Sequence, residues 1–259
     1  MPFLGGHSLT IYWYGVLVAT GFLVGLWNAS RRGARAGLSA ESIMDLGPCL
    51  LIGTLMGARA LYVISYWQDQ FAAKPWWEIF MIQHGGLVYY GGLIGASVSF
   101  IFCAWWKKLP LWRVADVLAP GIALGQAIGR LGCLMNGCCY GKPTSLPWAI
   151  QFPPGVIEAG TAGVHPTEIY ESILDFGLFV GLAWFHGRRR FDGQIFALYL
   201  LGYALLRSFV EIFRGDYSTC YLGFLTPGQV ASACILPIGL VLYWRLRLAA
   251  KATTPGRTD

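Results

Sequence analysis

The sequence predicts an all-α integral membrane protein, a polytopic bundle of about seven transmembrane helices with its N-terminus outside and its C-terminus inside. Of its 259 residues, 56% are hydrophobic and 12% are charged, whereas soluble domains carry about 25% charged residues. A helical crossing needs about 20 predominantly apolar residues, so we expect the long charge-free stretches to lie in a membrane. These stretches cover residues 1–28, 79–106, 193–206 and 217–244.

The distribution of the basic residues predicts the orientation. The net charge is +6, but the charge gathers in short clusters separated by apolar chain, which argues against nucleic acid as a partner. Each pair of neighbouring clusters is separated by enough apolar chain for two crossings, as the positive-inside rule requires when alternate loops face the cytoplasm. The clusters are Arg31, Arg32 and Arg35; Lys107, Lys108 and Arg113; Arg188, Arg189 and Arg190; and Arg245, Arg247, Lys251 and Arg257.

The apolar pattern places helices at about 9–29, 46–67, 86–106, 112–133, 167–186, 194–213 and 226–246. The first segment follows no basic stretch, so we expect a retained helix and not a cleaved signal peptide. We predict one transmembrane domain over residues 1–259 with a polar cytoplasmic tail at about 248–259. The longest connection, at about 133–165, lies on the outer side and is the candidate functional loop, because long loops often carry function.

Glycines recur four residues apart within several of these helices. Small residues one turn apart let helix backbones approach closely in lipid, so the spacing predicts compact helix packing. The sets are Gly21 and Gly25; Gly53 and Gly57; Gly91 and Gly95; Gly121, Gly125 and Gly129; and Gly177 and Gly181.

Charged residues inside the predicted spans are functional candidates, because burying a charge in a bilayer is costly. Tyr203, Arg207 and Glu211 share one helix face, with Arg214 one turn further on. An Arg207–Glu211 ion pair could simply lock the bundle; alternatively, the carboxylate holds a guanidinium that binds an anionic head group. Three weaker candidates could find partners within the bundle, and they are Arg59, Glu171 and Asp175.

Three short segments stand out for their glycines and polar residues. GQAIGRLGCLMNGCCYGKPT, residues 125–144, places Arg130 near a helix end and then turns through Asn136 and Gly141. Such a turn can present amide N–H groups and one cation to an anion. GGLVYYGGLIGA, residues 85–96, places glycine pairs around two tyrosines, and HPTEIYES, residues 165–172, has a proline suited to a first helical turn.

Four of the seven cysteines are predicted on or near the outer face, namely Cys133, Cys138, Cys139 and Cys220, while Cys49, Cys103 and Cys234 are predicted at membrane depth or inside. A metal site is disfavoured because adjacent cysteines fit tetrahedral ligation poorly and no histidine has ligand spacing. A disulfide bracing the outer loop is favoured, with free thiols as the main alternative. Their pairing cannot be read from sequence.

Together and in this order, IYWYG, GGLVYYGGLIG, GRLGCLMNGCCYG, HPTEIYES and LRSFVEIFR resemble the bacterial prolipoprotein diacylglyceryl transferases. The resemblance implies transfer of a diacylglyceryl group from phosphatidylglycerol to the lipobox cysteine thiol of preprolipoproteins, with release of glycerol phosphate. It implies action at the outer face of the bacterial inner membrane, without metal or cofactor. It also implies catalytic roles for Arg130 and Arg207, with Tyr203 as a partner on the same helix, and we predict Tyr90 as a further catalytic residue. The predicted substrate-binding residues are Tyr14, Asn136, Gly141, Glu211 and Arg214.

Three positions depart from the pattern of this family. Tyr90 stands where its best-known members have a histidine, Cys133 replaces an asparagine, and Cys138 replaces an acid. A general base therefore cannot be carried over, and the candidates are His84, His165, Tyr90 and Tyr203. The alternatives are a paralogue with another acceptor and a non-enzymatic phospholipid-binding or transport protein, although the inverted repeats typical of transporters are not found.

Overall fold

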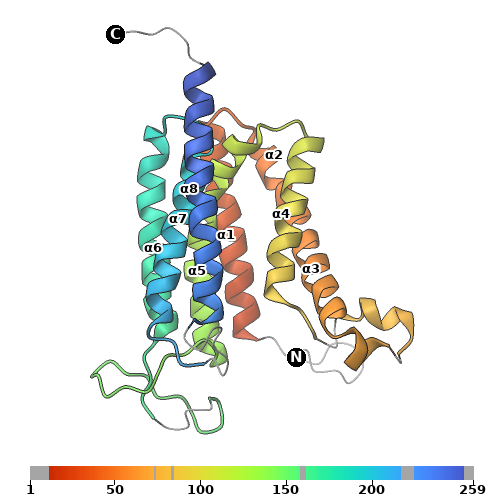
Figure 1. Ribbon diagram of the computed structural model, residues 1–259, viewed down its shortest axis with the longest axis vertical. Coiled ribbons are helices and arrows are strands. Elements are labelled where there is room, and N and C mark those ends of the chain that lie inside the picture. Colours follow the sequence, from red (N-terminus) through yellow and green to blue (C-terminus); the bar gives the residue numbers. More distant parts are fainter. Residues whose placement is uncertain (1–11, 73, 83–84, 158–161, 217–224, 254–259) are drawn as a thin grey trace, which may run out of the picture. The chain divides into compact units, whose positions relative to one another are not determined.

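The computed structural model describes residues 12–72, 74–82, 85–157, 162–216 and 225–253, and the described residues form an all-helical architecture without strands (Figure 1). The seven predicted helices are confirmed as helices, with boundaries that differ by a few residues. They are α1 (Trp13–Arg35), α3 (Leu46–Ser65), α4 (Tyr89–Trp106), α5 (Leu111–Asn136), α6 (Thr167–Phe185), α7 (Gln194–Glu211) and α8 (Pro227–Thr253). A short helix, α2 (Ala40–Met44), precedes α3.

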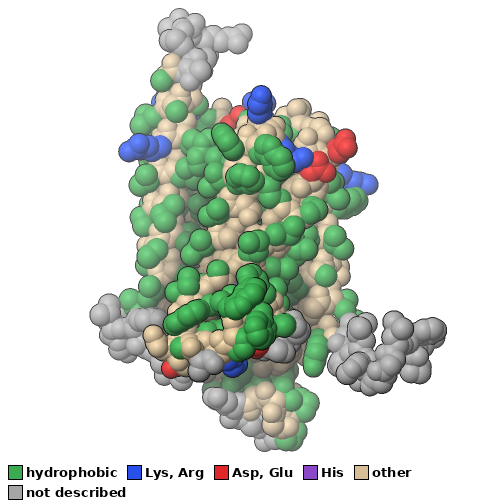
Figure 2. All heavy atoms as spheres, turned by 90° about the vertical axis from the view of Figure 1, so that its right-hand side faces the viewer, with side chains coloured by type: hydrophobic (Ala, Val, Ile, Leu, Met, Phe, Trp, Pro, Cys, Tyr) green, Lys and Arg blue, Asp and Glu red, His purple; other side chains and the backbone are tan. Residues whose placement is uncertain are grey.

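Among the described residues, four segments are long and apolar enough to cross a membrane, which supports a helical membrane protein. They are Ala40–Ser65, Leu111–Asn136, Gln194–Glu211 and Pro227–Ala252. On the face shown in Figure 2, hydrophobic side chains cover the helices along most of their length, and charged side chains gather mainly near helix ends. Seven crossings, with the N-terminus outside and the C-terminus inside, stay a prediction.

The chain forms two compact units, one of residues 1–29 with 115–259 and one of residues 30–114. A single transmembrane domain over the whole chain, with its cytoplasmic tail, stays a prediction. In the larger unit, α1 and α5 approach closely at their glycines, as predicted. A Cβ atom on Gly21 would lie 2.7 Å from the carbonyl oxygen of Gly125, so no larger side chain fits without moving a backbone.

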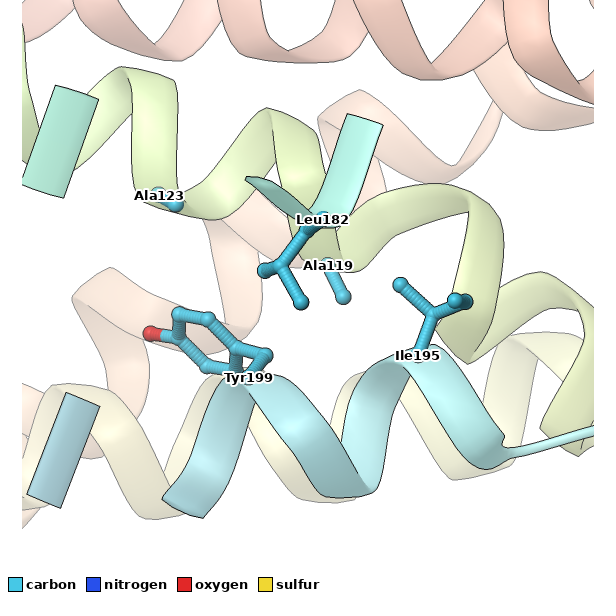
Figure 3. Close-up of a cluster of buried hydrophobic side chains, with 5 residues drawn as sticks. All are labelled: Ala119, Ala123, Leu182, Ile195 and Tyr199. Carbon is cyan, nitrogen blue, oxygen red and sulfur yellow. The ribbon is translucent and has the colours of Figure 1, made fainter. Parts of the chain in front are cut away.

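The core of the larger unit joins α5, α6 and α7. Leu182 of α6 lies between Ala119 and Ala123 of α5 and Ile195 and Tyr199 of α7 (Figure 3). These small, branched and aromatic side chains fill the space between the helices. Their packing fixes the positions of the polar residues on α6 and α7.

A buried carboxylate of α5 caps the N-terminus of α7. Asp116 is fully buried and accepts hydrogen bonds from the backbone N–H groups of Gly193 (2.8 Å) and Phe196 (2.9 Å). The first N–H groups of a helix have no partner within it, so this carboxylate supplies the missing acceptors. Gly193 has φ +89°, a conformation that favours glycine.

In the smaller unit, α3 and α4 pack through their predicted glycines, and a Cβ atom on Gly53 would lie 2.8 Å from the carbonyl oxygen of Gly95. A disulfide joins Cys49 of α3 to Cys103 of α4, a pairing that the sequence did not predict. Arg59 does find partners, and they are backbone oxygens of residues 78, 79, 85 and 86.

The prediction of close packing is wrong for Gly129, which has no described atom within 4 Å of an added Cβ, and for one glycine pair on α6. Gly177 and Gly181 on α6 have no atom within 4 Å of an added Cβ among the described residues, so no backbone requires their small size.

Candidate active site

Two arginines from different helices share one carboxylate in the larger unit. Arg130 of α5 contacts Glu171 of α6 through Nη2 and Oε1 at 2.7 Å. Arg207 of α7 donates from Nη1 to both oxygens of the same carboxylate, at 2.9 and 3.1 Å. The charge-assisted hydrogen bonds of Arg207 and the close ion pair of Arg130 fix the positions of both guanidinium groups. Glu171, a weaker candidate in the sequence, is therefore the centre of the ion-pair network.

The network continues along α7 and beyond its end. Arg207 Nη2 lies 2.8 Å from Glu211 Oε2, which confirms the predicted i, i+4 contact; this ion pair lacks hydrogen-bond geometry. Arg214 lies 3.8 Å from the same carboxylate and pairs with Asp216 at 2.7 Å. A Cβ atom on Gly228 would lie 2.6 Å from the Glu211 carboxyl carbon, so α8 packs its backbone directly on Glu211.

Two further acids of α6 lie on the face of Glu171. Glu168, Glu171 and Asp175 follow the spacing i, i+3, i+7, which brings three side chains to one helix face. All three are buried. Both oxygens of Glu168, and Oδ2 of Asp175, have no hydrogen-bond partner among the described residues. The site therefore concentrates carboxyl groups beside the arginines.

Accessibility differs between the two arginines. The Arg130 side chain is 20% exposed, whereas that of Arg207 is 9% exposed and that of Glu171 is 4% exposed. Arg130 is consequently the more accessible of the two arginines. A guanidinium suits phosphate because its N–H groups form a planar fork.

The predicted outer loop meets this end of the helices. Gly141 forms a backbone bridge with Arg214, and its N–H donates to the carbonyl of His165 at 2.9 Å. A Cβ atom on Gly141 would lie 2.6 Å from that carbonyl oxygen and 2.9 Å from the carbonyl oxygen of Phe213. Gly141 therefore lets three segments come together at the end of α7. The loop has its own small core of Tyr140, Phe152, Ile157 and Val164.

Three cysteine thiols gather at the C-terminal end of α5. The sulfur atoms of Cys133, Cys138 and Cys139 lie within 4.8 Å of one another and form no disulfide, so the predicted bracing disulfide is wrong for these three. Cys220 lies outside the described residues. Hydrogen bonds involving the thiols of Cys133 and Cys139 lower the pKa of the Cys138 thiol.

The predicted tyrosines of α1 and α7 lie near Arg130. Tyr14 interacts electrostatically with Arg130 and with the three thiols, and Tyr203 interacts electrostatically with Arg130. The Tyr203 ring stacks on that of Tyr199, with 6.0 Å between centroids. The end of α5 thus brings together residues from α1, α6 and α7.

Other predicted site residues lie apart from the ion-pair network, and one of them lies outside the described residues. Asn136 ends α5, is exposed, and contacts the sulfur of Cys138 at 3.6 Å. Tyr90 belongs to the smaller unit, where it pairs with Tyr89 in the first turn of α4. His84, a candidate base, lies outside the described residues, and His165 Nδ1 lies 3.3 Å from the Tyr170 hydroxyl.

Comparison with known proteins identifies the family. Residues 3–245 match the family model described as prolipoprotein diacylglyceryl transferase. The chain belongs to this family. The resemblance of its sequence segments to these enzymes is therefore confirmed.

Curated relatives cover nearly the whole chain. A phosphatidylglycerol–prolipoprotein diacylglyceryl transferase from Finegoldia magna is 39% identical over 236 residues, 91% of this chain and 91% of the relative. Relatives of the same name from Shewanella sp. (strain ANA-3) and Synechococcus elongatus are each 36% identical. They cover 90% and 91% of this chain, and 87% and 84% of their own lengths.

Proposed function

We propose that this chain transfers the diacylglyceryl group of phosphatidylglycerol to the lipobox cysteine thiol of preprolipoproteins and releases glycerol phosphate. The observation that carries this proposal is the meeting of Arg130 and Arg207 at Glu171, in a chain of the prolipoprotein diacylglyceryl transferase family. The enzymatic function is also the activity that the names of the relatives state.

Arg130 binds the phosphate of the donor lipid and stabilises the negative charge that develops as the phosphate leaves. Preorganised donors of this kind supply a large part of many rate enhancements. Arg207, held between Glu171 and Glu211, fixes the carboxylate that orients Arg130. Tyr203, beside Arg130, is a candidate for proton transfer, as is Tyr90.

The nucleophile in this proposal is the thiol of the acceptor. A thiol has a pKa of about 8.5 and is ionised to a few per cent at neutral pH. Its sulfur attacks the glyceryl carbon, the bond from that carbon to the phosphate oxygen breaks, and the proton of the thiol passes to a base. No covalent enzyme intermediate is required. Mass spectrometry of enzyme incubated with phosphatidylglycerol alone should find no diacylglyceryl adduct on the three clustered cysteines; an adduct would replace direct transfer with two successive displacements.

The decisive experiment is a lipidation assay in proteoliposomes of phosphatidylglycerol with a synthetic lipobox peptide. We expect a mass increase of one diacylglyceryl group on the peptide and release of glycerol phosphate. A peptide with serine in place of the acceptor cysteine is the matched control. Glycerol phosphate release without peptide modification would indicate a paralogue with another acceptor, and binding of lipid without turnover would indicate a non-enzymatic lipid-binding protein.

The proposed location is the bacterial inner membrane, with the site toward the outer face. The basic clusters support an N-terminus outside and a C-terminus inside. A reporter that is active only in the cytoplasm should be active when fused after Lys251. Silence there, together with activity of a fusion at Gly6, would reverse the orientation.

A further inference from the structure

A cluster of three thiols is left without a role in the proposed reaction. Cys133 lies in the last turn of α5, and Cys138 and Cys139 follow in the turn after it. The three sulfur atoms lie within 4.8 Å of one another, although the first and second cysteines are five positions apart in the chain. Each cysteine is partly buried and none forms a disulfide.

The backbone of this turn explains how adjacent cysteines converge. Gly137 has φ +67° and Cys139 has φ +73°, so a residue in the left-handed region stands on each side of Cys138. A non-glycine residue adopts this conformation at an energetic cost. The N–H of Cys138 donates to the carbonyl of Cys133 at 3.2 Å, and the Thr167 hydroxyl donates to the carbonyl of Cys139 at 2.6 Å. The neighbouring helix ends therefore hold the turn in place.

We propose that Cys133, Cys138 and Cys139 form a binding site for a thiophilic metal ion of the Zn²⁺ class. Zn–S bonds are about 2.3 Å long, which places two sulfurs on one tetrahedral ion about 3.8 Å apart. The three sulfurs lie at most 4.8 Å apart, within about 1 Å of this separation. Three protein ligands leave a fourth tetrahedral position for water or another small ligand.

Polar hydrogens around the cluster suit thiolate sulfur. Asn136 Nδ2 points to the sulfur of Cys138 at 3.6 Å, and Arg130 Nη1 points to the sulfur of Cys139 at 3.9 Å. Such N–H···S contacts orient metal-bound thiolates and tune their basicity. Three thiolates with one divalent cation carry a net charge of −1, and the Arg130 guanidinium lies beside this charge while it also pairs with Glu171. The expectation from sequence alone, that adjacent cysteines disfavour a metal, does not account for this turn.

The site is tested by counting metal, a measurement that does not depend on lipid transfer. The full chain is expressed with a tag that lacks histidine, purified under reducing conditions and analysed by inductively coupled plasma mass spectrometry. We expect about one zinc per chain in the wild type and in Cys234→Ser, whose thiol lies on α8 outside the cluster. Each of Cys133→Ser, Cys138→Ser and Cys139→Ser should weaken zinc binding about tenfold or more in competition with a chromophoric chelator.

Cobalt provides a second readout that reports the ligands. Co²⁺ added to metal-free wild type should give sulfur-to-cobalt charge-transfer absorption and the visible bands of a tetrahedral site. The triple serine variant should give neither, and zinc should raise the unfolding temperature of the wild type but not of this variant. Equal zinc content in the wild type and the triple variant, or a wild type that binds no metal when fully reduced, would overturn the proposal. Metal binding and lipid transfer are measured separately, so failure of the metal-site proposal is distinguishable from failure of the proposed function.

Discussion

Glu171→Gln is the sharpest perturbation of the network, because it removes one negative charge and almost no volume. The carboxylate receives Arg130 at 2.7 Å and Arg207 at 2.9 and 3.1 Å. A glutamine side chain offers one acceptor oxygen, and its NH₂ group faces one of the two guanidinium groups as a second donor. One arginine therefore loses its partner while it stays in a protein interior.

Removing one partner of a fully buried ion pair costs about 3–5 kcal/mol, since the other charge is left uncompensated. Arg130 is 20% exposed and can recruit water, so we expect about 3 kcal/mol, at the lower end of that range. Denaturation of the purified protein in mixed micelles measures this loss, and the lipidation assay measures activity per folded molecule. Activity should fall as well, because Arg130 is no longer held at one position.

Asp175→Asn is the matched control. Asp175 lies one turn further along α6, is buried like Glu171, and has an Oδ2 atom without a hydrogen-bond partner among the described residues. Neutralising it removes the cost of a buried charge, so stability should stay the same or rise. In a double-mutant cycle, the Arg130→Gln/Glu171→Gln double variant should lose less free energy of unfolding than the two single variants lose together, by about 1–3 kcal/mol. Glu171 does not organise the site if the losses of unfolding free energy are additive in this cycle. The same conclusion would follow if Asp175→Asn lost more stability than Glu171→Gln.

Three further variants test the parts around this centre. Arg130→Lys and Arg207→Lys keep the charge but lose the planar fork, so each should lose most transfer activity while the protein stays inserted; near-wild-type rates would refute a guanidinium-specific role. Gly141→Ala places a Cβ atom 2.6 Å from a backbone oxygen and should reduce both stability and activity, whereas Gly177→Ala, with open space around it, should be neutral in the same assays. Asp116→Ala removes the cap of α7 and should lower the free energy of unfolding by about 1–3 kcal/mol. Asp116→Asn keeps one acceptor and should lower it by less. Equal losses in the two variants would show that capping of α7 does not cause the destabilisation.

Features that depend on local spacing could be predicted from the sequence. The seven helices follow from apolar runs, and the Arg207–Glu211 contact follows from an i, i+4 spacing on one helix. The glycine contacts of α1 with α5 and of α3 with α4 also follow, because small residues one turn apart permit close approach.

Features that join distant segments could not be predicted in this way. Glu171 lies 36 positions from Arg207, and Asp116 lies 77 positions from the N–H group that it caps. The disulfide between Cys49 and Cys103 spans 54 positions. No local pattern selects such partners among several candidates. One signal was present for Glu171, since its spacing with Glu168 and Asp175 places three acids on one face of a helix that is otherwise largely apolar.

The charges of the ion-pair chain indicate how an anionic donor can enter it. Arg130, Arg207 and Arg214 are balanced by the carboxylates of Glu171, Glu211 and Asp216, so the chain of contacts is neutral. A phosphate that added to this arrangement without displacing a contact would bring an uncompensated charge into a poorly hydrated site. Exchange of the Arg130–Glu171 contact for an Arg130–phosphate contact instead leaves Glu171 bound to Arg207, which already donates to both of its oxygens. In the proposed mechanism the second arginine therefore has a physical reason to be present, although it is more deeply buried than the first: it would keep Glu171 paired while Arg130 holds the lipid.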